Sequence, residues 1–353
     1  MKFSTEIFSR VTTKDKAMLA RQLATMLSSG IAIDQSFKIL ASQTPRASLK
    51  QSFQTIVTDL EQGNNLAFSL SKHRNIFDPV FIAIVRSGES SGKLDVVLDQ
   101  LAERLEQSDD FNSKIKAALY YPLFIILTML VIVVLMMIYI IPQLKTVFED
   151  NGLSLPWTTK LIISVSNFTV QFWWVELIAV IVLGVAIILF LRSQRGGDFW
   201  DSLKIKLPIV GSLLRLIYMA RFCRTMSMLL QAGLPIMETI AITADVIQNH
   251  IFTISLKNVA AQVERGIPMS VPMQKDKHYP VLVSEMVMVG EQTGKMGQIL
   301  TKLAGYYERE TETMIKGLSS LIEPVIIVIV GTAVGFLVFS IIWPIYGIAQ
   351  TGF

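Results

Sequence analysis

The chain has 353 residues, of which 52% are hydrophobic and only 17% are charged, and its formal net charge is +4. Soluble proteins carry about 25% charged residues, so this composition indicates a membrane protein with sizeable soluble parts. The single cysteine, Cys223, excludes an intrachain disulfide, and the first residues lack the apolar stretch of a signal peptide.

Residues 1–116 are predicted to form a bundle of about six helices. Apolar residues recur there at helical spacing between stop signals, and no stretch alternates as a strand does. Thr13 is the expected N-cap of the first helix. Asp78 and Pro79 are typical of an N-cap and a first helical residue. From Lys93 a long amphipathic helix leads towards the first strongly apolar segment.

Residues 117–142 are predicted to form the first transmembrane helix. No charge occurs between Ala117 and Leu144, and about 20 apolar residues suffice to cross the hydrocarbon core of a membrane. Pro122 removes a backbone donor, and its ring clashes with the carbonyl of Ala118. We therefore expect a kink or a break at the entry of this span.

The rest of the chain repeats the alternation of charged and apolar segments. Residues 143–172 are expected to form an external, periplasmic loop, and residues 173–191 a second, shorter span. Residues 192–318 are again charged and helical in pattern, which predicts a second bundle. Residues 319–344 are the predicted third span, and residues 345–353 an external tail.

The two bundles are related by an internal repeat. RQLATMLSSGIAI at 21–33 matches RTMSMLLQAGLPI at 224–236 at an offset of 203. RSGESSGKLDVVLDQLAERLE at 86–106 matches MVGEQTGKMGQILTKLAGYYE at 288–308 at an offset of 202. The fold class predicted is therefore an all-α membrane protein with two homologous cytoplasmic six-helix bundles and three transmembrane helices.

The repeat extends into the spans, because Pro122 and Pro324, the two span-entry prolines, are 202 positions apart. Two like-oriented halves need one further crossing between them, which residues 173–191 supply. All but two of the 32 lysines and arginines then lie on one side of the membrane. The positive-inside rule makes that side the cytoplasm. We expect a cytoplasmic N-terminus and an external C-terminus.

A short motif, G-E-x-[ST]-G, occurs once in each half. Its candidate site residues are Gly88, Glu89, Gly92, Gly290, Glu291 and Gly294. It lacks the glycine spacing and the Ser or Thr after lysine of a phosphate loop, so we interpret it as a tight turn between two helices, with glycines at positive φ. The two glutamates are candidates for contact with a partner, with the N-terminus of the next helix or, less favoured, with a cation.

No constellation of catalytic residues is recognisable. The histidines are single and scattered, and no zinc, redox or nucleophile motif occurs. The predicted spans carry no charge near their centres, which argues against an ion pathway. We therefore expect no enzyme activity, no cofactor, no metal and no nucleic-acid partner.

These motifs resemble one family, the type II secretion F and type IV pilus PilC platform proteins. The matching segments of the first half are RQLATMLSSGIAI, FDPVFIAIVRSGESSGKL and KAALYYPLFI. Those of the second half are RTMSMLLQAGLPI, VSEMVMVGEQTGKM and GLSSLIEPVIIVIVG. The resemblance covers nearly the whole chain, about residues 10–350.

The resemblance implies a multi-pass inner-membrane protein that couples a cytoplasmic assembly ATPase to the assembly of pilin or pseudopilin subunits. It also implies contacts with other inner-membrane assembly components and a homo-oligomer. A small membrane transporter or permease subunit is the alternative, because duplicated membrane proteins are common among transporters. Three spans without a polar midplane favour the platform protein.

Overall fold

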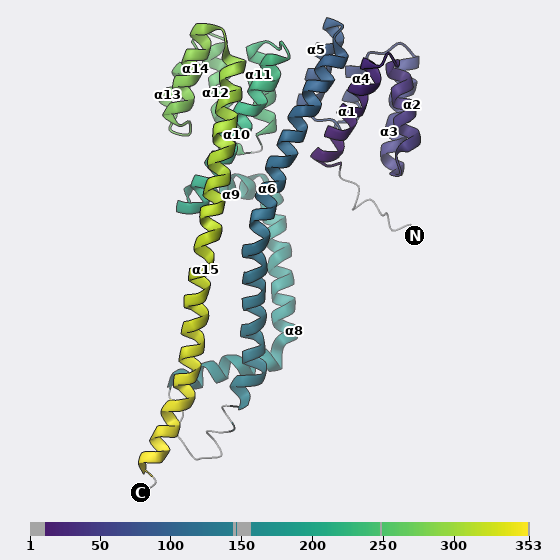
Figure 1. The fold of residues 1–353 in the computed structure, drawn as a ribbon. Coiled ribbons are helices and arrows are strands. Elements are labelled where there is room, and N and C mark those ends of the chain that lie inside the picture. The colour runs from purple at the N-terminus through teal and green to yellow at the C-terminus, as the bar shows by residue number, and fades with distance from the viewer. Residues whose placement is uncertain (1–10, 144–145, 147–156, 248, 352–353) are drawn as a thin grey trace. The chain divides into compact units, whose positions relative to one another are not determined.

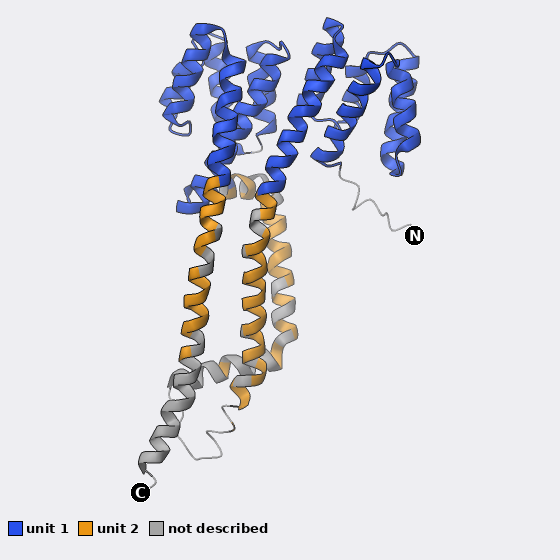
Figure 2. Ribbon diagram, viewed as in Figure 1, with its two compact units in different colours: residues 1–114, 201–312 blue, residues 115–200, 313–353 orange. Residues whose placement is uncertain are grey.

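The computed structural model describes residues 11–143, 146, 157–247 and 249–351. Within these residues every regular element is helical, as predicted for an all-α protein (Figure 1). The chain divides into two compact units (Figure 2). Unit 1 comprises residues 1–114 and 201–312, and unit 2 comprises residues 115–200 and 313–353.

Six helices begin in the first bundle of unit 1: α1 (Thr13–Ser28), α2 (Ile33–Gln43), α3 (Ala47–Glu61), α4 (Leu66–Ser71), α5 (Pro79–Ser91) and α6 (Leu94–Leu135). Helix α1 starts with a capping box: Asp15 N donates to Thr12 Oγ1 at 3.1 Å, and Thr12 N donates to the Asp15 carboxylate at 2.9 Å. The expected N-cap, Thr13, is wrong by one residue. The N-cap is Thr12, because Thr12 and not Thr13 has an acidic residue three positions later. Helix α5 begins as predicted at Asp78 and Pro79.

Aromatic side chains form the centre of the first bundle. Phe37, Phe53, Phe77 and Phe81 are almost fully buried. The rings of Phe37 and Phe53 meet edge to face with centroids 5.7 Å apart. Fully burying such a side chain contributes about 1.5–3 kcal/mol. The Phe37 and Phe53 rings therefore hold α2 against α3, and all four rings belong to one buried cluster.

The second bundle of unit 1 is built from α10 (Pro208–Gln231), α11 (Ile236–Val246), α12 (His250–Val263), α13 (Ser270–Lys275), α14 (Val281–Thr293) and the first part of α15 (Met296–Thr351). Helix α9 (Gln194–Lys206) precedes it. The core again contains buried rings, with Phe222 and Tyr279 at 5.8 Å between centroids.

The repeat inferred from the sequence is also a repeat in backbone conformation. Among the described residues, glycines with positive φ form three pairs at the offsets found above: Gly30 with Gly233, Gly63 with Gly266 and Gly92 with Gly294. Each pair ends the corresponding helix of its bundle. The two bundles therefore have the same helix order and the same helix ends.

Unit 2 contains the later parts of α6 and α15, a π-helical turn (Met136–Ile140) and α8 (Trp157–Arg192). Helix α8 departs from helical geometry at Phe172 (φ −119°, ψ 24°), next to the predicted start of the second span. Residues 157–171, expected within the external loop, are helical. The remainder of that loop includes residues 147–156, which lie outside the described residues.

The expected break at Pro122 is wrong. Helix α6 runs from Leu94 to Leu135 without interruption, and α15 likewise continues through Pro324. A proline removes one backbone donor, and in helices of this length the flanking turns retain their own hydrogen bonds. Each of these helices therefore begins in unit 1 and continues into unit 2 as one element.

Among the described residues, no helix combines the length and the hydropathy needed to cross a membrane.

Candidate functional site

The G-E-x-[ST]-G motif is mostly helical, so the expected turn over residues 88–92 is shorter than predicted. Gly88 and Glu89 lie within α5, and only Gly92, at φ 67°, has the left-handed conformation. The second half is the same: Gly290 is helical and Gly294 has φ 66°. Positive φ at the first glycine of each motif was therefore a wrong expectation.

The first glycine of each motif allows two helices to approach closely. A Cβ added to Gly88 would lie 3.0 Å from Val97 Cβ and 3.3 Å from Leu94 Cα, at the start of α6. A Cβ added to Gly290 would lie 3.0 Å from Met296 Cα, at the start of α15. These separations are tighter than ordinary contacts, so a larger side chain would require the neighbouring residues to shift. Packing therefore favours glycine here.

Both motif glutamates cap a short helix of their own bundle. The Glu89 carboxylate accepts hydrogen bonds from Leu66 N at 2.6 Å and Ala67 N at 3.1 Å, at the start of α4. The unpaired backbone N–H groups at a helix start favour a negative charge there. Sequence reasoning considered a helix N-terminus, but the helix capped is an earlier one and not the next.

The same arrangement recurs in the second bundle. The Glu291 carboxylate accepts from Met269 N, from Ser270 N at 3.1 Å and from Ser270 Oγ at 2.5 Å, at the start of α13. Within the part of the chain that the structure describes, no cluster of three or more histidine, cysteine or acidic side chains could hold a metal ion. The geometry therefore gives both glutamates an internal structural role.

A second repeated constellation joins the first and last helices of each bundle. In the second bundle Arg224 of α10 binds Glu308 of α15 in a bidentate way through one guanidinium edge, with Nε to Oε1 at 2.9 Å and Nη2 to Oε2 at 2.5 Å. In the first bundle Arg21 of α1 binds Glu106 of α6 at 3.0 and 2.9 Å. The repeat places Arg21 on Arg224 and Glu106 on Glu308. Sequence reasoning missed this pair, although the aligned segments contain it.

The two pairs differ in exposure because the bundles contact each other on one side only. The side chains of Arg224 and Glu308 are 13% and 18% exposed, against 38% and 48% for Arg21 and Glu106. Gln107 of the first bundle accepts from Arg224 Nη1 at 2.9 Å. The hydrogen bond from Arg21 lowers the pKa of Glu106 below its usual value. The first pair thus behaves as a surface pair and the second as an interface pair.

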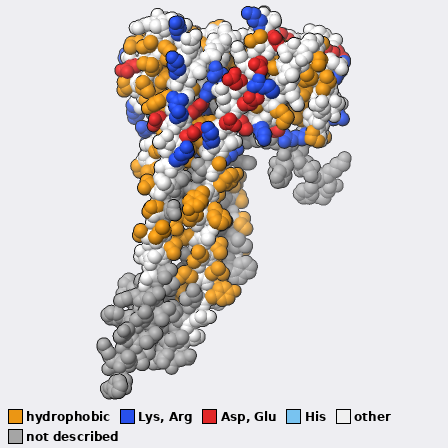
Figure 3. Space-filling view, viewed as in Figure 1, with side chains coloured by type: hydrophobic (Ala, Val, Ile, Leu, Met, Phe, Trp, Pro, Cys, Tyr) orange, Lys and Arg blue, Asp and Glu red, His pale blue; other side chains and the backbone are white. Residues whose placement is uncertain are grey.

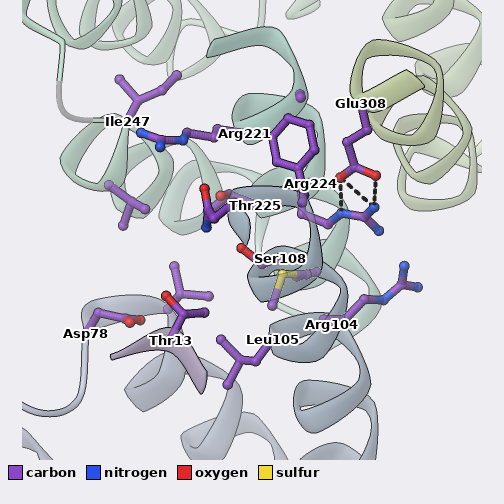
Figure 4. A pocket seen from close by; sticks show the side chains of 16 residues that line it. Thr13, Asp78, Arg104, Leu105, Ser108, Arg221, Arg224, Thr225, Ile247 and Glu308 are labelled. Carbon is purple, nitrogen blue, oxygen red and sulfur yellow. Dashed lines mark hydrogen bonds and ion pairs between the residues drawn. The ribbon is translucent and has the colours of Figure 1, made fainter. Parts of the chain in front are cut away.

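A pocket of about 260 Å³ lies where the bundles meet, lined by residues of both. Figure 4 shows Arg224 directed at Glu308, with Arg104 on α6 and Arg221 on α10 at the edges of the same pocket. Burial and the neighbouring charge of Arg224 lower the pKa of Arg104. Arg104 also donates to Gln231 at 3.0 Å. The pocket is therefore a gap in the contact between bundles, lined by both charged and apolar side chains.

The side-chain classes differ between the units. On the face shown in Figure 3, acidic and basic side chains gather over unit 1, whereas hydrophobic side chains dominate the described surface of unit 2. Exposed apolar residues of α6 include Leu123, Phe124 and Leu127. Pro324, a predicted span-entry residue, lies on α15 in unit 2.

Comparison with known proteins gives one consistent result. The family model described as type II secretion system protein F matches residues 19–142 and 222–344, once in each half of the chain. The chain is 33% identical over 344 residues to the type IV pilus assembly protein TapC of Aeromonas hydrophila, covering 96% of this chain and 82% of that protein. It is 31% identical to the type IV pilus assembly protein PilC of Myxococcus xanthus, covering 97% and 82%. It is 28% identical to the type II secretion system protein F of Aeromonas hydrophila, covering 95% and 86%.

Proposed function

The chain belongs to the type II secretion system protein F family, and we propose that it is the inner-membrane platform protein of a type IV pilus or type II secretion assembly machine. In this role it couples a cytoplasmic ATPase to the assembly of pilin or pseudopilin subunits. Relatives named for pilus assembly and for type II secretion match along nearly the whole chain, which supports a machine of this kind.

The proposal includes three membrane spans, at residues 117–142, 173–191 and 319–344, with both bundles in the cytoplasm. It rests on the uncharged runs of the sequence and on the side of the basic residues. The exposed apolar side chains of α6 and α8 are consistent with a lipid environment. Glu89 and Glu291 then stabilise the bundles, and contacts with the ATPase fall on other bundle surfaces.

One observation carries the mechanism: α6 and α15 are each continuous from a charged bundle into an apolar segment. A helix of this kind transmits displacement along its axis because it stays helical through its proline, and the flanking turns keep their backbone hydrogen bonds. A movement imposed on a bundle by the ATPase would therefore reach the segment that meets the hydrophobic helix of a subunit.

The function is tested by deleting the gene and complementing it with an affinity-tagged full-length chain. We expect the deletion to abolish filaments or secretion, and the complemented strain to yield the ATPase in the purified complex. Normal filaments after deletion, combined with solute flux through vesicles that contain the protein, would support the transporter alternative.

Topology needs a separate test. Cys223 is buried, so a Cys223→Ala chain provides a background without reactive thiols. We expect a membrane-impermeant maleimide to label Asn151→Cys from outside intact cells, and Gln54→Cys only after the membrane is opened. Labelling of both positions from the same side would contradict the proposed spans.

A further inference from the structure

The contact between the two bundles uses different faces of the repeated fold. The first bundle contributes its α5–α6 face, defined by Val80, Ile84, Arg86, Ser87 and Arg104. The second bundle contributes its α10–α11 face, defined by Leu229, Gln231, Ala232, Leu234 and Glu238. Arg86 Nη1 lies 3.2 Å from Glu238 Oε1, and Ser87 Oγ donates to the carbonyl of Ala232. Leu229 and Leu234 belong to the same buried cluster as the core of the first bundle.

Because the two bundles repeat each other, each face of this contact has a counterpart in the other bundle. At the offset of 202, α5 and the start of α6 correspond to α14 and the start of α15. At the offset of 203, the end of α10 and α11 correspond to α1 and α2. The molecule therefore contains two faces of each kind. One of each kind is used in the internal contact, and one of each kind is left: the α14–α15 face and the α1–α2 face.

The remaining α14–α15 face is apolar and exposed. Leu282 corresponds to Val80 and is 39% exposed, whereas Val80 is 7% exposed. Val289, which corresponds to Ser87, and Tyr306, which corresponds to Arg104, are also exposed. Protein–protein interfaces are enriched in aromatic side chains. An exposed aromatic residue beside exposed aliphatic ones is therefore typical of an interface.

The remaining α1–α2 face offers the matching surface. Met26 and Ile31 correspond to the buried Leu229 and Leu234, and both are half-buried. Ser28 and Ser29 correspond to Gln231 and Ala232 and are exposed. Two small side chains at these positions leave room for a larger partner. The α1–α2 face therefore carries half-buried apolar side chains beside two small exposed ones, opposite which Val289 and Tyr306 can be placed.

We propose that a second copy of this chain places its α1–α2 face on the α14–α15 face of the first copy and so repeats the internal bundle contact between chains. Val289 then faces Ser29, and Tyr306 takes the place of Arg104 with its hydroxyl within reach of Ser28. One equivalent pair carries like charges, Arg309 with Arg21, and Arg21 is already neutralised by Glu106 and Asp99.

Such a contact is head-to-tail, because each copy gives one face and receives the other. The resulting assembly alternates first and second bundles, with an intramolecular contact and an intermolecular contact of the same design. It rests on the repeat and on the bundle contact, and it does not depend on the proposed function.

The test is cysteine crosslinking of full-length protein in native membranes, in the Cys223→Ala background. Two differently tagged chains are co-expressed, one with Val289→Cys and one with Ser29→Cys, and the membranes are oxidised. We expect a disulfide-linked species that carries both tags. A Ser87→Cys, Ala232→Cys double variant serves as the internal reference, because Ser87 Oγ donates to the carbonyl of Ala232 across the internal contact.

The matched control pairs Val289→Cys with Gln54→Cys, an exposed position on α3 outside both faces. Three results would overturn the proposal. The first is failure of the Val289 and Ser29 pair to crosslink while the reference disulfide forms. The second is equal crosslinking of the control pair. The third is a crosslink of Val289→Cys to itself or to another protein in place of Ser29→Cys.

Discussion

At the scale of single residues, equivalent positions of the two bundles make the same hydrogen bonds even where the surrounding sequences differ. Glu89 and Glu291 each accept two backbone N–H groups at the start of a short helix, across 21 to 23 positions of chain. Helices as short as α4 and α13 are unstable on their own. A carboxylate held on a neighbouring long helix therefore fixes them in the bundle.

Replacing Glu89 by alanine should destabilise α4 by about 1 kcal/mol, in the range found for lost N-caps. The reason is that Leu66 N and Ala67 N lose their acceptor. Hydrogen–deuterium exchange of the peptide covering α4 measures the effect, and we expect faster exchange there than in α2. Ser90→Ala is the matched control, because Ser90 is exposed next to Glu89. Equal exchange in the two variants would argue against capping.

The start of α1 yields a pH prediction. Burial raises the pKa of Asp15, but hydrogen bonds from Thr12 and the ion pair with Arg46 outweigh it and leave the pKa below its usual value. A lowered carboxylate pKa contributes stability that is present above the unfolded pKa, about 3.9, and is lost as the pH falls through the folded pKa. Asp15→Asn should therefore lower the unfolding temperature at neutral pH, and thermal unfolding should show this effect disappear as the pH falls through the folded pKa.

The capping box itself is tested by Thr12→Ala, which should cost about 1 kcal/mol, compared with Thr13→Ala. Thr13 is already inside the helix and gives its neighbour no cap. We expect thermal unfolding of the detergent-solubilised chain to shift clearly for Thr12→Ala and less for Thr13→Ala. The reverse order would restore the N-cap expected from the sequence.

At the scale of helices, much of the architecture could be predicted because stop signals are local. Positive-φ glycines, the Asp78-Pro79 start and the apolar periodicity are properties of a few neighbouring residues. The Thr12 cap was missed by one position because both threonines suit the site, and only the distance to Asp15 decides. The pairing of Glu89 with α4 and of Arg21 with Glu106 is non-local, so the sequence could show only that these residues recur.

The two ion pairs that join the first and last helix of each bundle, Arg21–Glu106 and Arg224–Glu308, should differ in strength. Breaking a partly exposed pair costs about 0.2–1 kcal/mol, and breaking a buried pair about 3–5 kcal/mol. Arg224→Met, which leaves Glu308 in the interface without its cation, should therefore destabilise unit 1 more than Arg21→Met. Denaturant unfolding of each variant, monitored by the circular dichroism signal of its helices, measures the difference in stability. A larger loss for Arg21→Met would mean that the bundle contact does not shield Arg224.

At the scale of the whole molecule, two copies of one design are joined within a single chain. The repeat was readable from the sequence because glycines and prolines keep their register over hundreds of positions. The contact between the bundles was not readable, since its residues differ between the halves: Arg86 and Ser87 on one side correspond to Met288 and Val289 on the other. Duplication thus preserved the bundle interior and left the outer faces free to diverge.

The continuity of α6 gives the last prediction. Four glycines inserted after Lys116 should interrupt the helix between its bundle part and its apolar part, because glycine costs about 1 kcal/mol per helical position. We expect the variant protein to enter the membrane and to bind the ATPase but to assemble no filaments. The reason is that a movement of the bundle would no longer reach the apolar part of α6. The same insertion after Gly63, in the turn between α3 and α4, serves as control and should retain assembly. Filament counts by electron microscopy decide between them, and normal filaments from the first variant would mean that force reaches the membrane by a route other than α6.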